Sequence, residues 1–169
     1  MIISPRLVLL FLCIVDIAWS LSANQLAFLE STINENSCEF YNSLEKLMPC
    51  GKNGYVIGFG YKYCEAYLAA RNEFNDIKWQ NGVRVCLQRT ILSKFQNISE
   101  ASCSQISDWG FDSHFGCYMH PISDSPEINF CHLKSMDIIK IAWIAKSKLL
   151  KQEVMNQFLK LIQQCTTPN

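Results

Sequence analysis

The feature that most constrains this chain is its set of nine cysteines, of which only Cys13 lies in the N-terminal apolar segment. The other eight form an even number, which in an exported chain indicates disulfide bonds before metal ligands. No Cys-x-x-Cys pair occurs, so the usual zinc and thioredoxin-type motifs are absent. Spacing alone does not choose among the many pairings that eight cysteines allow. The eight are Cys38, Cys50, Cys64, Cys86, Cys103, Cys117, Cys131 and Cys165.

The N-terminal segment has the features of a signal peptide. One positive charge precedes an apolar stretch over residues 7–17, and small residues then stand at the −3 and −1 positions of a cleavage site. We expect a signal peptide over residues 1–20, with a second cleavage option after Ser22. The stretch is shorter than the about 20 residues that span a bilayer, and Asp16 argues against the alternative of an uncleaved anchor. We therefore expect a secreted, extracellular protein without a membrane span, with a glycosylation sequon at Asn97.

Composition and periodicity indicate a single all-α domain over residues 21–169. Hydrophobic residues make up 49% of the chain, which is enough for a core. Lys+Arg equals Asp+Glu at 15 each, so the overall charge favours no nucleic-acid partner. Few runs alternate with period two, so a sheet is not expected. We expect five or six helices stapled by disulfides, with a long C-terminal helix.

Capping residues, glycine and proline indicate where the expected helices begin and end. Ser99 is expected to cap a helix that Gly110 ends, and Ser125–Glu127 resembles another helix start, because Pro is favoured in the first turn. In the helix expected over residues 79–95, Arg84, Gln88, Arg89 and Lys94 are expected to lie off the apolar face. Further helices are expected over residues 38–48, 61–70, 79–95 and 132–165, with a short helix or loose arm over 21–37 and a turn over 50–54.

The expected C-terminal helix has a periodic apolar face and many lysines. A bend in the helix is expected near Ser147, and the residues expected on its apolar, buried face are Met136, Ile139, Trp143, Leu150, Val154, Phe158, Leu161 and Cys165. Six lysines against two acidic residues give this helix a net charge of +4 (6 − 2), whereas the rest of the mature chain carries −4 (8 − 12). The simplest interpretation is the solvated side of an amphipathic helix. A more specific interpretation is a basic stripe that binds a sulfated glycan or an acidic partner. That stripe would comprise Lys140, Lys146, Lys148 and Lys151.

Catalytic and metal-binding motifs are weak. Asp112-Ser113-His114 offers the residue types of a hydrolase, but a nucleophile, a base and an orienting acid must converge in space, which consecutive residues rarely do. No Gly-x-Ser-x-Gly elbow is present. The three histidines include no i, i+4 pair for a metal, and no calcium-loop or phosphate-loop motif occurs. We expect no catalytic residue, cofactor or metal, and a small secreted hydrolase using His114 and Asp112 is the least favoured alternative.

Several ordered features of the cysteine-bearing segment occur together. They are Cys64 before an aromatic and alanine-rich helix, Phe74 before Trp79, Cys86-Leu87, Cys103 with Ile106, Cys117-Tyr118, and a closing run Leu161–Cys165. In this order they resemble the stanniocalcin family of secreted glycoprotein hormones, in a divergent, invertebrate-type form. The resemblance spans about residues 38–165.

This resemblance implies a pairing and a function. The implied function is a hormone-like signalling or regulatory protein that binds an extracellular protein partner or receptor, with a role in calcium or phosphate homeostasis. A secreted effector or protease inhibitor on the same scaffold is the alternative. The chain lacks the family's cysteine for covalent dimers, which leaves a monomer or a non-covalent homodimer. The implied disulfides are Cys38–Cys64, Cys50–Cys103, Cys86–Cys117 and Cys131–Cys165.

Overall fold

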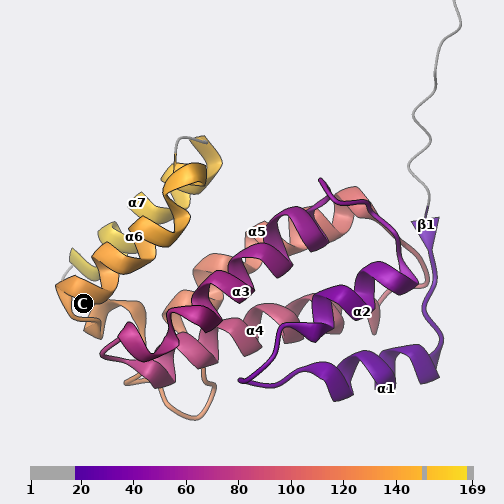
Figure 1. Cartoon of the computed structure of the whole chain (residues 1–169), viewed down its shortest axis with the longest axis horizontal. Coiled ribbons are helices and arrows are strands. Elements are labelled where there is room, and N and C mark those ends of the chain that lie inside the picture. The colour runs from indigo at the N-terminus through magenta and orange to yellow at the C-terminus, as the bar shows by residue number, and fades with distance from the viewer. Residues whose placement is uncertain (1–17, 150–151, 167–169) are drawn as a thin grey trace, which may run out of the picture.

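The computed structural model describes residues 18–149 and 152–166, and this part of the chain is an all-α domain stapled by four disulfides (Figure 1). The expected fold class is therefore confirmed, with seven α-helices in place of five or six. The predicted signal peptide lies outside the described residues except for its last three. The elements are β1 (Ala18–Trp19), α1 (Ala23–Thr32), α2 (Glu39–Leu47), a π-helical turn (Val56–Tyr61), α3 (Lys62–Ala69), a 3-10 turn (Arg71–Glu73), α4 (Ile77–Phe95), β2 (Ala101–Ser102), α5 (Cys103–Met119), a 3-10 turn (Phe130–His132), α6 (Ser135–Leu149) and α7 (Gln152–Thr166).

The five helices α1–α5 form one body with the two short strands, of which β1 lies within the expected signal peptide and would be removed by cleavage after Ser20. β1 pairs antiparallel with β2, and the partly buried Trp19 packs against the body's core. Ser22 caps α1 through a reciprocal capping box with Gln25, which satisfies backbone N–H groups at the helix start. The core of the body is a cluster of buried apolar side chains from α1, α2, the π-helical turn, α4 and α5. Its fully buried members include Leu29, Phe40, Leu44, Met48, Ile91 and Ile106.

The helices α6 and α7 form a hairpin at the opposite end of the molecule from β1 (Figure 1). We refer to them as the C-terminal hairpin. The expectation of one long helix over residues 132–165 is therefore wrong. A straight helix would separate Cys131 from Cys165 by about 50 Å at about 1.5 Å per residue, whereas their disulfide holds the two Cα atoms 5.2 Å apart. A second buried cluster joins the hairpin to α3 and α4, and it comprises Tyr67, Phe74, Trp79, Val83, Phe130, Leu133, Ile141 and Leu161.

Helix α5 corrects two further expectations. Its cap is Ser102, again in a capping box with Gln105, and not Ser99. It also continues through Gly110 for nine more residues, to Met119. Gly110 is buried against Tyr55, and a Cβ atom built on it would lie 2.0 Å from the Tyr55 Cζ atom. The glycine is therefore needed for a close approach between two elements, and its cost in helix propensity of about 1 kcal/mol is offset by that packing.

Two other expectations fail for physical reasons. Residues 125–127 do not start a helix but form successive turns, which lead into the buried side chain of Phe130. Helix α4 has the expected position, but Arg84 and Gln88 are buried at 3% and 0% exposure. Neighbouring helices cover the sides of α4 that carry Arg84 and Gln88, whereas Arg89 and Lys94 are exposed as expected. The turn over residues 50–54 is confirmed, with Gly51 at a positive φ of 82° that favours glycine.

Candidate functional site

The lysines of the expected basic stripe lie in different surroundings. Lys140 is half-buried, with its Nζ atom 3.3 Å from Glu73 Oε2, so its charge is paired. Lys146 is exposed, with its Nζ atom 3.5 Å from the centre of the Trp143 ring. Lys148 is half-buried and lines a cavity beneath the hairpin. Lys151 lies outside the described residues.

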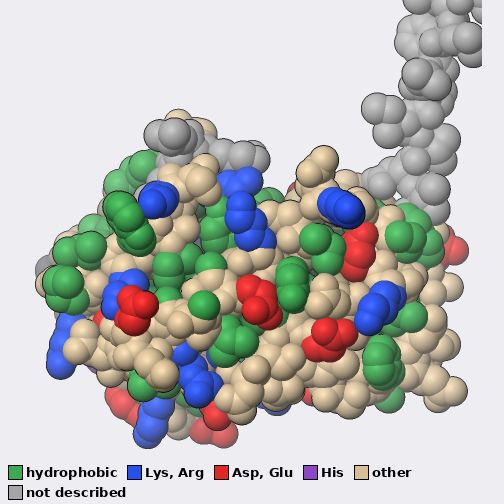
Figure 2. Space-filling view, in the orientation of Figure 1, with side chains coloured by type: hydrophobic (Ala, Val, Ile, Leu, Met, Phe, Trp, Pro, Cys, Tyr) green, Lys and Arg blue, Asp and Glu red, His purple; other side chains and the backbone are tan. Residues whose placement is uncertain are grey.

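Helix α6 exposes three large apolar side chains on the side that faces away from the body. Met136, Ile139 and Trp143 are 62%, 59% and 67% exposed, and we call them the outer stripe. The expectation that these residues face the core is wrong. Helix α6 is apolar on more than one side, so periodicity cannot choose between them, and Ile141 takes the buried position at 2% exposure. In Figure 2, hydrophobic side chains gather over the end of the molecule where Figure 1 places α6 and α7, with basic side chains among them.

Asp137 fixes the side of α6 that faces the body. Its carboxylate is completely buried in the first turn of α6. Oδ1 accepts hydrogen bonds from the backbone and side-chain nitrogens of Asn75, at 2.9 and 3.0 Å, and Oδ2 accepts one from the backbone nitrogen of Asp76 at 3.2 Å. Asp76 in turn caps α4 by accepting from the Trp79 backbone nitrogen at 2.8 Å. The hairpin is thereby tied to the start of α4, which leaves the outer stripe facing solvent.

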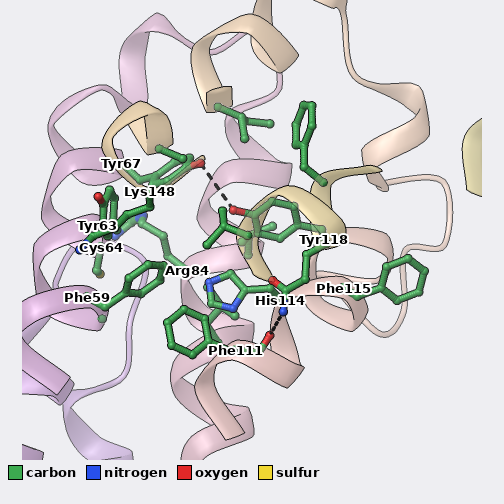
Figure 3. Close-up of a pocket in the computed structure, with 18 of the residues that line it drawn as sticks. Phe59, Tyr63, Cys64, Tyr67, Arg84, Phe111, His114, Phe115, Tyr118 and Lys148 are labelled. Carbon is green, nitrogen blue, oxygen red and sulfur yellow. Dashed lines mark hydrogen bonds between the residues drawn. The ribbon is translucent and has the colours of Figure 1, made fainter. Parts of the chain in front are cut away.

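A cavity of about 90 Å³ lies between the hairpin and the body (Figure 3). Its walls are largely aromatic and aliphatic side chains from α3 and α5 on one side and α6 and α7 on the other. Tyr63 Oη lies 2.8 Å from Ser147 Oγ, and Gln157 Nε2 donates to Phe111 O at 2.8 Å. These two hydrogen bonds connect the body with the half of the hairpin nearest its connection at residues 150–151. We call this space the hairpin cavity.

His114 lines the hairpin cavity as a neutral imidazole. Its Nδ1 atom lies 2.7 Å from Gly110 O, and because a carbonyl oxygen only accepts, Nδ1 carries the proton. Desolvation in aromatic surroundings lowers the pKa of His114, although hydrogen bonds to backbone oppose the shift. Ser113 Oγ donates to the same Gly110 oxygen at 2.8 Å, and Asp112 is exposed. The serine is thus not bonded to the imidazole, and these three residues do not form a catalytic triad.

Within residues 18–149 and 152–166, no group of His, Cys, Asp or Glu could hold a metal ion. His132 Nδ1 is bonded to Glu127 O at 2.6 Å, and His120 is exposed. In the same part of the chain, no helix is long and apolar enough to cross a membrane.

The cysteines pair as Cys38–Cys64, Cys50–Cys103, Cys86–Cys117 and Cys131–Cys165, which are the same four pairs that the resemblance implies. The first two link α2 and the following loop to α3 and α5, and the third links α4 to α5. The fourth joins the two ends of the hairpin. Asn97 is exposed just after the end of α4, so its side chain is accessible for glycosylation.

Comparisons with known proteins add no family to this description. The chain matches no family model, and neither the curated proteins nor the solved structures contain a match to it. The outer stripe and the hairpin cavity are therefore the features from which a function is argued. Neither feature was predicted from the sequence. The apolar residues on more than one side of α6 were a signal for the outer stripe.

Proposed function

We propose that this protein is an extracellular, stanniocalcin-like regulatory protein that binds a partner protein through the outer stripe of α6. The observation that carries this proposal is the exposure of Met136, Ile139 and Trp143 on one face of a helix whose opposite face is fixed by buried Asp137. The disulfides suit an oxidising extracellular environment. The Cys131–Cys165 disulfide and the buried Asp137 also fix the position of α6 before binding, which lowers the cost of ordering the outer stripe in a complex.

The composition of the outer stripe favours a protein interface. Tryptophan is among the residues that most often supply the energy of protein contacts, and apolar side chains grouped on one face are typical of interaction sites. Lys146 lies over the Trp143 ring and so restricts its motion while keeping a charge at the edge of the patch. The three side chains would form the centre of a larger contact surface.

The charges beside the outer stripe indicate an acidic partner. Lys134 and Lys146 are exposed near the two ends of the outer stripe. Asp137 is the one acidic residue of α6, and it is buried. A second copy of this chain would bring like charges together if the same faces met. A partner with apolar side chains flanked by carboxylates would complement the surface better.

The proposal can be tested by measuring binding of the labelled, secreted protein to a panel of cultured cells. We expect saturable binding that protease treatment of the cells removes, because the partner is a protein. Trp143→Ala is expected to weaken this binding about thirtyfold, as for a residue at the centre of an interface. The matched control is Phe28→Ala, which removes an aromatic side chain, 51% exposed, from α1 in the body.

Other outcomes would contradict the proposal. Equal binding by the Trp143→Ala and Phe28→Ala variants would exclude the outer stripe as the contact. Removal of binding by heparinase, together with a steep loss at moderate salt, would instead assign the surface to a sulfated glycan. Dimerisation of the wild-type protein that Trp143→Ala abolishes would assign it to a second copy of the chain.

A further inference from the structure

The hairpin cavity combines apolar walls with positive charge. Phe59, Phe111 and Tyr118 are among the aromatic residues that line it, and Figure 3 shows them around His114, with Tyr67 beside Tyr118. Among the described lining residues the cations are Arg84 and Lys148, and none is an aspartate or glutamate. An apolar space with cations and no acidic side chain is suited to a ligand that is itself apolar and negatively charged.

Arg84 is a buried cation in the wall of the hairpin cavity. It is 3% exposed, and its Nη2 atom donates to Glu35 O and to Asn81 Oδ1 at 3.0 Å. Its Nε and Nη1 atoms are buried with no hydrogen-bond partner. Burial also lowers the pKa of Arg84, which reflects the cost of keeping the charge away from water. The carboxylates of Glu35 and Glu65 oppose this lowering of the pKa, but among the described residues neither forms an ion pair with Arg84, so two buried N–H groups beside the cavity have no acceptor.

We propose that the hairpin cavity binds a small apolar carboxylate, such as a short or medium-chain fatty acid. The hydrocarbon part would occupy the aromatic space between the hairpin and the body. The carboxylate would compensate the charges of Arg84 and Lys148 in surroundings of low dielectric constant, where such an attraction is strong. This proposal goes beyond the proposed function and does not depend on it, because the outer stripe lies on the other side of α6.

The size of the cavity sets the length of the ligand. An engineered cavity of about 150 Å³ binds benzene, so the about 90 Å³ here holds roughly four carbon atoms without rearrangement. A longer chain would require the hairpin to move away from the body. The Tyr63–Ser147 and Gln157–Phe111 hydrogen bonds oppose that movement. Affinity should therefore rise by about fourfold per methylene while the cavity fills, and should level off for longer chains.

The test is calorimetric titration of the full secreted protein with acetate, propanoate, butanoate, hexanoate and octanoate, and with octan-1-ol as the neutral match to octanoate. We expect one site per chain, the length dependence given above, and binding of octanoate about tenfold tighter than that of octanol. Equal affinity for octanoate and octanol would overturn the assignment of an anionic ligand. Absence of binding by every member of the series would overturn the site itself.

Three variants and one control variant locate the ligand. Ala145→Phe adds a ring to a half-buried residue of the cavity wall and should abolish octanoate binding. Lys148→Met should remove most of the preference for octanoate over octanol, whereas Lys146→Met, two residues away on the outer side of α6, should leave it unchanged. Arg84→Met should act like Lys148→Met, provided that its circular dichroism is native. Octanoate binding that survives Ala145→Phe would place the ligand elsewhere, for example on the outer stripe, and would contradict the proposal.

Discussion

The body and the C-terminal hairpin are stabilised in different ways. Three disulfides and a continuous buried cluster hold the body together, and Cys38, Cys64 and Cys117 are buried within it. The hairpin has one disulfide, and both of its cysteines are exposed. Its other described attachments are the buried Asp137, a few hydrogen bonds and the smaller second cluster. The hairpin can therefore loosen while the body stays folded, and both proposed binding features lie on it.

The largest expected effect separates the two kinds of disulfide. Loop closure over 26 residues for Cys38–Cys64 and 34 residues for Cys131–Cys165 predicts a similar loss of about 3.5 kcal/mol when either bond is removed. Replacing the buried pair Cys38 and Cys64 by alanine also leaves unfilled space in the core, which raises that loss to about 5 kcal/mol. Urea unfolding of the two double-alanine variants would measure the difference. An equal loss in both would remove the distinction drawn between body and hairpin.

The second prediction concerns packing within the body. Gly110→Ala would force a Cβ atom into the buried Tyr55 ring, so we expect a loss of about 3 kcal/mol in the free energy of unfolding. Gly116 lies in the same helix and is exposed, and a methyl group added to it would meet nothing within 4 Å, so Gly116→Ala should stabilise the protein by about 0.5–1 kcal/mol. Thermal unfolding of the two variants gives opposite signs. The same sign in both would show that Tyr55 yields easily.

The third prediction concerns the tie between the two regions. Asp137→Ala would leave the Asn75 and Asp76 donors without their acceptor, which should cost about 2–3 kcal/mol. Hydrogen exchange should then increase in α6 and α7 more than in α1 and α2. The control is Asp112→Ala, at an exposed position of α5, which should change stability by no more than about 0.5 kcal/mol. Uniformly faster exchange would mean that the hairpin and the body unfold as one unit.

The smallest expected effect lies at the boundary between the regions and depends on pH. Burial lowers the pKa of His114 below its ordinary value of 6.5, so the folded state binds this proton more weakly than the unfolded chain. The contribution to stability is complete above about pH 6.5 and decreases as the pH falls below it, by at most about 1.4 kcal/mol per pH unit, until the folded-state pKa is reached. Urea midpoints at pH 7.5 and 5.5 should differ less for His114→Phe than for the wild-type protein. An unchanged difference would assign the pH dependence to other groups.

The helical class of the fold and most helix positions could be predicted from the sequence, because the apolar residues of α2 and α4 recur at intervals that only a helix explains. The signals that failed were those that a partner element overrides. Gly110 has the propensity of a helix terminator, but Tyr55 packs against it and the helix continues. Arg84 and Gln88 are polar, but neighbouring helices cover them.

The binding features were harder to predict for a related reason. The exposure of Met136, Ile139 and Trp143 depends on the rotation of α6, which the single buried carboxylate of Asp137 and its partners at residues 75–76 help to set. Those partners lie about 60 residues earlier in the chain, so no local pattern contains the information. Helix α6 ends at Leu149 and α7 begins at Gln152, and the sequence between them contains no glycine or proline.

The position of Asn97 has a practical consequence. It lies in the sequence between α4 and β2, which pairs with β1, and Figure 1 shows β1 at the opposite end of the molecule from α6 and α7. A sugar chain on this residue would project away from both proposed binding features. Immobilising the glycoprotein through its oxidised carbohydrate would therefore orient every molecule with α6 and α7 toward the solution, ready for partner or fatty-acid measurements on a sensor surface.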